Sequence, residues 1–128
     1  MHIGGDLDTI MAGLSCGEPS LVAWPLLDAG THCFMRIPDG EALASMRVLA
    51  AGAGGDPPIV AGESGAAGLA GLLALCKDRE TAGRLGLDGQ ARVLVFGTEG
   101  DTDAELYAEI VGETGDAVRA RQARQGTD

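Results

Sequence analysis

A polar loop over residues 98–103 carries the densest set of reactive side chains in this chain. Its six residues, TEGDTD, hold two hydroxyls, three carboxylates and one glycine. The loop follows an apolar run over residues 92–96 and precedes a helical pattern over residues 104–111. Ligands of α/β proteins bind where a strand ends in a loop and turns into a helix. The spacing therefore predicts a ligand-binding loop, although one of its last three residues could simply cap the helix.

The same loop could support a different chemistry, the binding of a metal ion. Glu99, Asp101 and Asp103 supply oxygen ligands of the kind that Mg²⁺ and Ca²⁺ prefer. Their spacing does not match the known calcium-loop pattern. A cation site is therefore a weaker hypothesis than a site for an organic ligand.

Composition limits the classes of function. The chain has 128 residues, 45% of them hydrophobic, which is enough for one domain with a core. Aromatic residues are only 3% and glycine numbers 21, so the core must be built from small aliphatic side chains. The formal net charge of -10 argues against a nucleic-acid partner, which requires a concentrated positive surface.

The three cysteines, Cys16, Cys33 and Cys76, are an odd number without metal-ligand spacing. This usage is typical of a reducing cytoplasm. No apolar run is long enough for a membrane span, and no signal peptide is recognisable, so we expect a cytoplasmic location. Cys76 lies in an apolar helical run and is expected in the core, whereas a bond between Cys16 and Cys33 stays open.

The elements that must position the loop alternate between helical and extended patterns. Helices are expected over residues 20–29, 38–51, 64–76, 79–85 and 104–112, and strands over residues 32–36, 59–60 and 91–97. Val93, Leu94, Val95 and Phe96 are consecutive, which is typical of a central parallel strand covered by helices on both sides. One good strand cannot form a sheet by itself. The fold class is therefore α/β, as part of a larger domain.

Two features concern the boundaries of these elements. Pro25 lies inside the first helical pattern and is expected to kink it. Residues 1–112 are expected to form the structured segment, and residues 113–128 a polar, flexible tail.

Three segments of the chain together resemble a known family. They are GDLDTIMAGLSCGEP over residues 5–19, GESGA over residues 62–66, and TEGDTD over residues 98–103. In this order and spacing they resemble the C-terminal third of diaminopropionate ammonia-lyase, from about Gly4 to Val111. That family belongs to the pyridoxal-phosphate enzymes of the tryptophan-synthase β/threonine-dehydratase fold type. The resemblance implies a three-layer domain with mostly helices around one or two parallel strands.

The resemblance also implies roles for individual residues. Thr98 would place its hydroxyl beside the pyridine nitrogen of the cofactor, with Gly100 in the same loop. The second segment would line the ring or the turn beneath it with Glu63, Ser64, Gly65 and Ala66. Ser64 could equally cap the following helix, whereas Glu63 is the better ligand candidate, because an acid gains little from helix formation there. Met11, Ala12, Gly13 and Cys16 would border the substrate entrance.

The chain departs from the family in what it lacks. The Schiff-base lysine and the phosphate loop of the family lie N-terminal to the matching segment. Lys77, the single lysine, does not match the family's lysine motif. We therefore expect a segment of a cytoplasmic, homodimeric ammonia-lyase that converts 2,3-diaminopropionate to pyruvate and ammonia, inactive and without cofactor when alone.

Two partners are open for such a segment. It could pair with the missing N-terminal portion and act on a small amino-acid substrate. Alternatively, it is a truncated, non-catalytic remnant that associates with itself and binds no cofactor.

Overall fold

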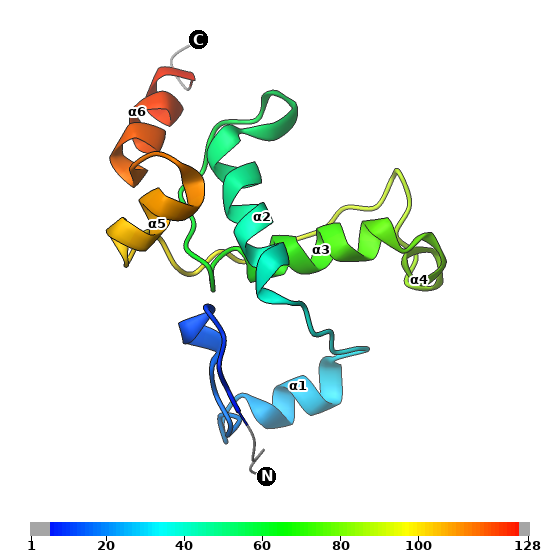
Figure 1. Ribbon diagram of the computed structural model, residues 1–128. Coiled ribbons are helices and arrows are strands. Elements are labelled where there is room, and N and C mark those ends of the chain that lie inside the picture. Colours follow the sequence, from blue (N-terminus) through cyan, green and yellow to red (C-terminus); the bar gives the residue numbers. More distant parts are fainter. Residues whose placement is uncertain (1–5, 126–128) are drawn as a thin grey trace.

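The computed structural model describes residues 6–125, and its regular elements are all helical (Figure 1). In chain order they are η1 (Ala12–Leu14), α1 (Trp24–Gly30), α2 (Asp39–Ala51), η2 (Ala53–Gly55), α3 (Ala67–Lys77), α4 (Arg79–Arg84), α5 (Ala104–Val111) and α6 (Gly115–Gln125). Residues 1–5 and 126–128 lie outside the described part. Residues 1–5 belong to the expected structured segment and include the first residue of the first motif, and residues 126–128 belong to the expected tail.

The expected strand over residues 91–97 is not formed, and no other strand occurs in residues 6–125. The parallel-strand content of the expected α/β fold is therefore wrong for this chain by itself. The side chains of this apolar run are open to solvent, with Leu94 78% and Phe96 76% exposed. A strand exists only through hydrogen bonds to a neighbouring strand, and residues 6–125 supply no such neighbour.

The helices expected over residues 38–51, 79–85 and 104–112 are confirmed as α2, α4 and α5. Asp103 begins α5, because its carboxylate accepts a hydrogen bond from the Leu106 amide at 3.0 Å. Gly112 ends it with a positive φ of 89°, a conformation that glycine adopts without strain. Pro25 lies in the first turn of the shortened α1 instead of kinking it. Its missing N–H is not needed at that position.

A small core joins α2, α5 and α6 at one end of the molecule. Met46 and Ala50 of α2 meet Tyr107 and Ile110 of α5 and Val118 of α6, and Ala66 closes the cluster from the start of α3. Two arginines fasten the C-terminal helices to α2: Arg47 donates to the Ile110 carbonyl at 2.8 Å, and Arg121 donates to the Ala50 carbonyl at 2.7 Å. We call α2, α5, α6 and the turn over residues 58–66 the packed region.

The expected flexible tail over residues 113–128 is instead the helix α6 over Gly115–Gln125. Its side chain Val118 is fully buried, and Arg119 forms an ion pair with Asp101. The helix is polar because only one narrow face meets α2 and α5. The sequence pattern is therefore weak, and the docking decides the structure. The proposed boundary at residue 112 stays a prediction.

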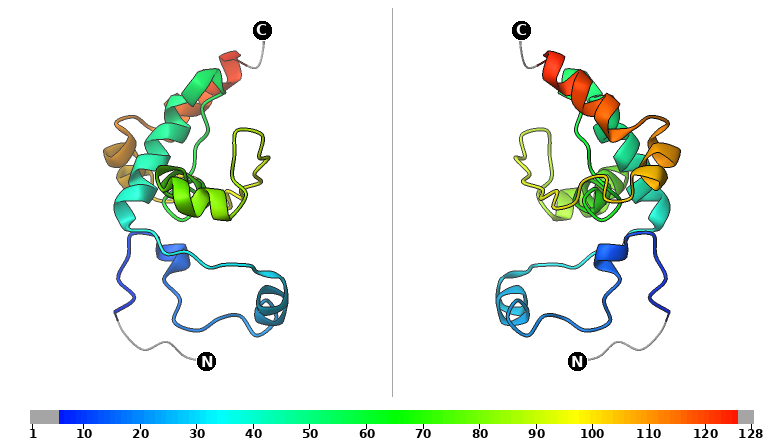
Figure 2. Two further views of the ribbon diagram at one scale, coloured as in Figure 1. Left: turned by 90° about the vertical axis from the view of Figure 1, so that its right-hand side faces the viewer. Right: turned by 90° about the vertical axis from the view of Figure 1, so that its left-hand side faces the viewer.

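Residues 6–37 form a separate loop that lies below the helical cluster (Figure 2). It is tied to the N-terminus of α2, where the Thr9 hydroxyl donates to Asp39 at 2.6 Å. Within the loop, Trp24 of α1 stacks on Phe34, with ring centroids 6.2 Å apart. Most large apolar side chains here are exposed, as are those of residues 85–97. We call these two stretches, residues 6–37 and 85–97, the open region.

The helix α3 connects the two regions. Its apolar composition predicts a buried helix, but only Ala70 and Gly71 within it are buried. Cys76 is exposed, so its expected place in the core is wrong. The outer face of α3 is therefore uncovered in residues 6–125. None of the helices found in residues 6–125 is long and apolar enough to cross a membrane.

Candidate functional site

The second and third motif segments meet at one junction, although 35 residues separate their contacting groups. The Glu99 carboxylate accepts hydrogen bonds from the backbone amides of Ser64, at 2.8 Å, and Gly65, at 3.2 Å. The Glu99 carbonyl accepts a further bond from the Gly62 amide at 3.2 Å. Three bonds therefore hold the turn over residues 62–66 against the loop over residues 98–103.

Glycine is required on the turn side of this junction. A Cβ atom at Gly62 would lie 2.3 Å from the Gly100 carbonyl oxygen. A Cβ atom at Gly65 would lie 2.5 Å from the Glu99 carbonyl oxygen. Both distances are far inside van der Waals contact, and the opposing atoms belong to the backbone. The two glycines thus allow the turn and the loop to touch.

The predicted ligand groups lie around this contact with different exposure. Thr98 is exposed, and its hydroxyl makes no hydrogen bond within residues 6–125. Glu63 is buried, with 9% of its surface exposed. Its carboxylate has no hydrogen-bond partner within residues 6–125. Ala66 is fully buried in the core cluster, so it supports the turn from behind. Of these side chains, Thr98 is therefore open to a ligand, whereas Glu63 is buried without a partner in the described residues.

The first motif reaches the same junction from the open region. The Gly13 amide donates to the Ser64 hydroxyl at 3.0 Å. The Ser64 side chain therefore contacts this loop and does not cap α3, which has no side-chain cap. Met11 is buried, whereas Ala12 and Cys16 are exposed. All three motif segments thus meet near Ser64.

Cysteine chemistry near the junction is simple. Cys16 and Cys33 are free and exposed, so the possible bond between them is not formed. The Cys16 thiol donates to the Glu18 carbonyl at 2.9 Å.

The three carboxylates of the loop do not converge. Glu99 binds the turn amides, Asp103 caps α5, and Asp101 forms an ion pair with Arg119. The hydrogen bond from Arg119 lowers the pKa of Asp101 below its ordinary value. No group of three or more potential metal ligands exists in residues 6–125. The alternative of a cation site is therefore not supported.

Glu99 is the residue of the junction that sequence reasoning missed. The loop was recognised, but Glu99 was considered only as a possible metal ligand. One signal could have identified it: a helix start needs one capping carboxylate, and this loop contains three. The side chain faces amides that are distant in sequence, and only the folded chain brings them within reach.

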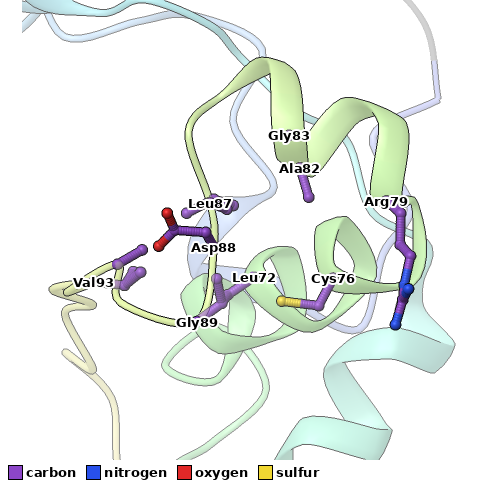
Figure 3. Close-up of a pocket in the computed structure, with 10 residues that line it drawn as sticks. Leu72, Cys76, Arg79, Ala82, Gly83, Leu87, Asp88, Gly89 and Val93 are labelled. Carbon is purple, nitrogen blue, oxygen red and sulfur yellow. The ribbon is translucent and has the colours of Figure 1, made fainter.

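A cavity of about 560 Å³ lies elsewhere, between α3, α4 and the loop that follows (Figure 3). Its lining includes Cys76, Arg79 and Asp88, and none of the predicted site residues. Figure 3 shows the Cys76 sulfur directed into the space between the elements. The cavity lies next to the uncovered outer face of α3 and is separate from the junction.

Comparisons with known proteins show which proteins this chain is similar to. Diaminopropionate ammonia-lyase of Salmonella typhimurium is 44% identical over 113 residues, which cover 85% of this chain and 28% of that protein. The enzyme of Escherichia coli K12 is 44% identical over 121 residues, or 92% of this chain and 30% of that protein. The chain resembles diaminopropionate ammonia-lyase. The likeness that the three segments indicated is confirmed. No protein-family model matches the chain.

Solved structures of diaminopropionate ammonia-lyase agree. The E. coli enzyme in complex with an aminoacrylate-PLP azomethine reaction intermediate superposes with a TM-score of 0.75 at 44% identity, over 80% of this chain and 28% of that one. Its complex with D-serine gives 0.73 at 42% identity, over 83% and 28%. The complete relative is thus a pyridoxal-phosphate enzyme. The present chain spans less than a third of the length of these relatives.

The residues present fit only one edge of pyridoxal phosphate. The unpartnered Thr98 hydroxyl suits the hydrogen-bonding edge of a pyridine ring. The single lysine, Lys77, lies at the far end of α3 from the junction, with its amine 2.7 Å from the Glu41 carboxylate. The chain by itself therefore does not supply a complete site for this cofactor.

Proposed function

We propose that this chain forms one wall of the active site of a pyridoxal-phosphate-dependent ammonia-lyase. The complete enzyme would convert 2,3-diaminopropionate to pyruvate and ammonia. The observation that carries the proposal is the junction, because the three segments of the resemblance meet around Ser64. When bound, the cofactor supplies the elimination chemistry. The chain would supply the hydroxyl of Thr98, with Glu63, Gly65 and Gly100 shaping the surface beside the ring.

The same proposal accounts for the missing strand. In the complete domain, residues 91–97 would pair with strands from the rest of the enzyme, in a three-layer arrangement. Support comes from α3, where a Cβ atom at Gly68 would lie 2.9 Å from Val95. This close contact places the apolar run on the helix, as in a sheet covered by helices.

The experiment is complementation. The chain is produced alone and together with the part of the E. coli enzyme that it does not match. We expect pyruvate release from 2,3-diaminopropionate only when both are present. The chain alone should show no visible cofactor band after dialysis, because its single lysine lies at the far end of α3 from the junction.

Lys77→Ala is the matched control. It should leave the activity of the complex unchanged, since the complementary part would contribute the cofactor lysine. A band in the isolated chain that survives dialysis and disappears in Lys77→Ala would show instead that Lys77 binds the cofactor. A complex that forms and binds cofactor but releases no pyruvate would contradict the proposed reaction.

A second candidate function is a non-catalytic remnant that associates with itself. The observation in its favour is the exposed apolar surface of the open region, including Leu21, Val22 and Phe96. Exposed apolar surfaces of this kind mark sites of protein association, and here the partner would be a second copy of the chain. Complementation separates the two candidates, because a remnant would not restore pyruvate release.

The remaining expectations belong to the complete enzyme. We propose a homodimer that acts on a small amino acid, with neither nucleic acid nor a membrane as a partner. A cytoplasmic location agrees with the three cysteines, which are all free.

A further inference from the structure

We propose that Glu99 is a positioning residue that sets the place of the Thr98 hydroxyl. The inference rests on the proposed function, in which Thr98 faces the cofactor. The Glu99 carboxylate is directed toward the turn, where it accepts hydrogen bonds from the Ser64 and Gly65 amides. Its effect on the chemistry would pass through its neighbour in sequence.

The geometry gives Glu99 control over both sides of the junction. One carboxylate oxygen accepts from the amides of Ser64 and Gly65, and the other is 3.4 Å from the Thr102 hydroxyl. The backbone carbonyl of the same residue binds Gly62. The side chain and the backbone of Glu99 are thus both fixed. The backbone that joins Thr98 to Glu99 is therefore fixed as well.

The hydrogen bonds that Glu99 accepts from the turn form a clamp. The negative charge of the carboxylate strengthens the bonds to its side chain. A carboxylate that accepts bonds from backbone amides forms stronger hydrogen bonds than a neutral acceptor does. The Gly65 position is buried, so water cannot readily replace a lost partner. Thr98, in contrast, has no side-chain hydrogen bond within residues 6–125 that would hold it independently. Its placement therefore depends on the residue that follows it.

Alanine and glutamine substitutions separate charge from shape. Glu99→Ala removes both side-chain acceptors. Glu99→Gln keeps one carbonyl oxygen that can accept from the turn amides, and its amide can donate to Thr102. Asp103→Ala is the matched control, because it removes another carboxylate-to-amide bond, to Leu106, in the same loop but outside the junction.

The first measurement is hydrogen exchange of the peptide over residues 62–67 in the full chain, followed by mass spectrometry. We expect Glu99→Ala to accelerate exchange there about tenfold or more, as the loss of a charged hydrogen bond implies. Glu99→Gln should recover only part of the protection, because a neutral amide oxygen is a weaker acceptor than a carboxylate, and Asp103→Ala should affect only residues 104–108. Exchange over residues 62–67 that is equal in the wild type and Glu99→Ala would overturn the clamp.

The second measurement uses the complex with the complementary part of the E. coli enzyme. Glu99→Ala should lower kcat about tenfold or more, with a smaller change in KM, and shift the cofactor absorption band. Glu99→Gln should restore only part of the rate, because its amide oxygen carries no charge. A wild-type rate and band in Glu99→Ala would reduce Glu99 to a structural role and overturn the inference. A wild-type complex without cofactor would instead refute the proposed function, and with it this role of Glu99, whatever the exchange result.

Discussion

The packed region and the open region are both rich in apolar side chains, but they bury them to opposite extents. Met46 and Val118 in the packed region are fully buried, whereas Leu21 and Leu94 in the open region are 83% and 78% exposed. In the packed region each apolar helix face has a partner within the chain. In the open region it does not. An apolar pattern therefore predicts that a surface will be covered. It does not predict whether the covering surface comes from the same chain or from another one.

The candidate site lies at the border between the two regions. Glu99 and Ser64 bring the motifs together from the packed side, and Gly13 joins them from the open side. The side of the junction that faces Thr98 is uncovered. This arrangement is what one wall of a larger site requires.

The largest effect should appear when the open region is made polar. We expect the isolated chain to associate with itself, because the apolar run over residues 93–96 is exposed and without strand partners. The double variant Leu94→Lys, Phe96→Lys should be a monomer by size-exclusion chromatography with light scattering. A monomeric wild type with a sharp, cooperative unfolding transition would contradict the contrast between the regions.

Core truncation should distinguish the regions by stability. Met46→Ala removes a fully buried side chain and should lower the free energy of unfolding by about 2–5 kcal/mol. The matched variant Leu26→Ala, at a side chain 75% exposed in α1, should change it by less than about 0.5 kcal/mol. Urea unfolding followed by circular dichroism measures both. Equal costs would mean that the open region is packed in solution.

Substitutions of Thr98 in the complemented enzyme test the candidate site at the border between the two regions. Thr98→Val keeps the shape and removes the hydroxyl, which costs about 1 kcal/mol for a neutral hydrogen bond and slows elimination about five- to tenfold. Thr98→Asp should be slower still, because a carboxylate would favour a protonated ring. Cofactor titration and steady-state rates report both effects. Full activity in both variants would assign the ring nitrogen to another residue.

The smallest effect concerns the ion pair that holds α6. The hydrogen bond from Arg119 lowers the pKa of Asp101 from its ordinary value of 3.8. The pair therefore stabilises the folded chain above that pH, and the contribution disappears as pH falls through the lowered value. Asp101→Asn should cost about 0.2–1 kcal/mol at neutral pH and reduce the acid sensitivity of the helical signal.

Asp116→Asn is the control for this effect. Asp116 contacts the same arginine at 3.0 Å, but its side chain is 94% exposed. It should therefore matter less than Asp101. An equal loss of stability in both variants would show that the negative charge near Arg119 matters and that the contact of α6 with the loop does not.

Some of the structure could be predicted from local sequence. The helices α2 and α5 follow from apolar spacing, and Asp103 and Gly112 mark the ends of α5. These features depend on residues within one or two turns of each other, so the sequence specifies them directly. The three motif segments could be recognised for a similar reason, because their residue types and order are visible in the chain.

Other features could not be predicted, because they depend on contacts between distant residues. α6 is a helix where a tail was expected, since Val118 finds a pocket between α2 and α5. Residues 91–97 are not a strand where one was expected, since the described part of the chain contains no second strand to pair with them.

The sequence by itself determined where α2 and α5 begin and end and which residues resemble a pyridoxal-phosphate enzyme. The tertiary structure alone decided that Glu99 joins the turn at Ser64 and Gly65 to the loop, and that the apolar run stays uncovered. The physical reason is one of range. Helix hydrogen bonds and caps close within a few residues, whereas a carboxylate clamp or a strand needs a partner that only folding, or another chain, brings near.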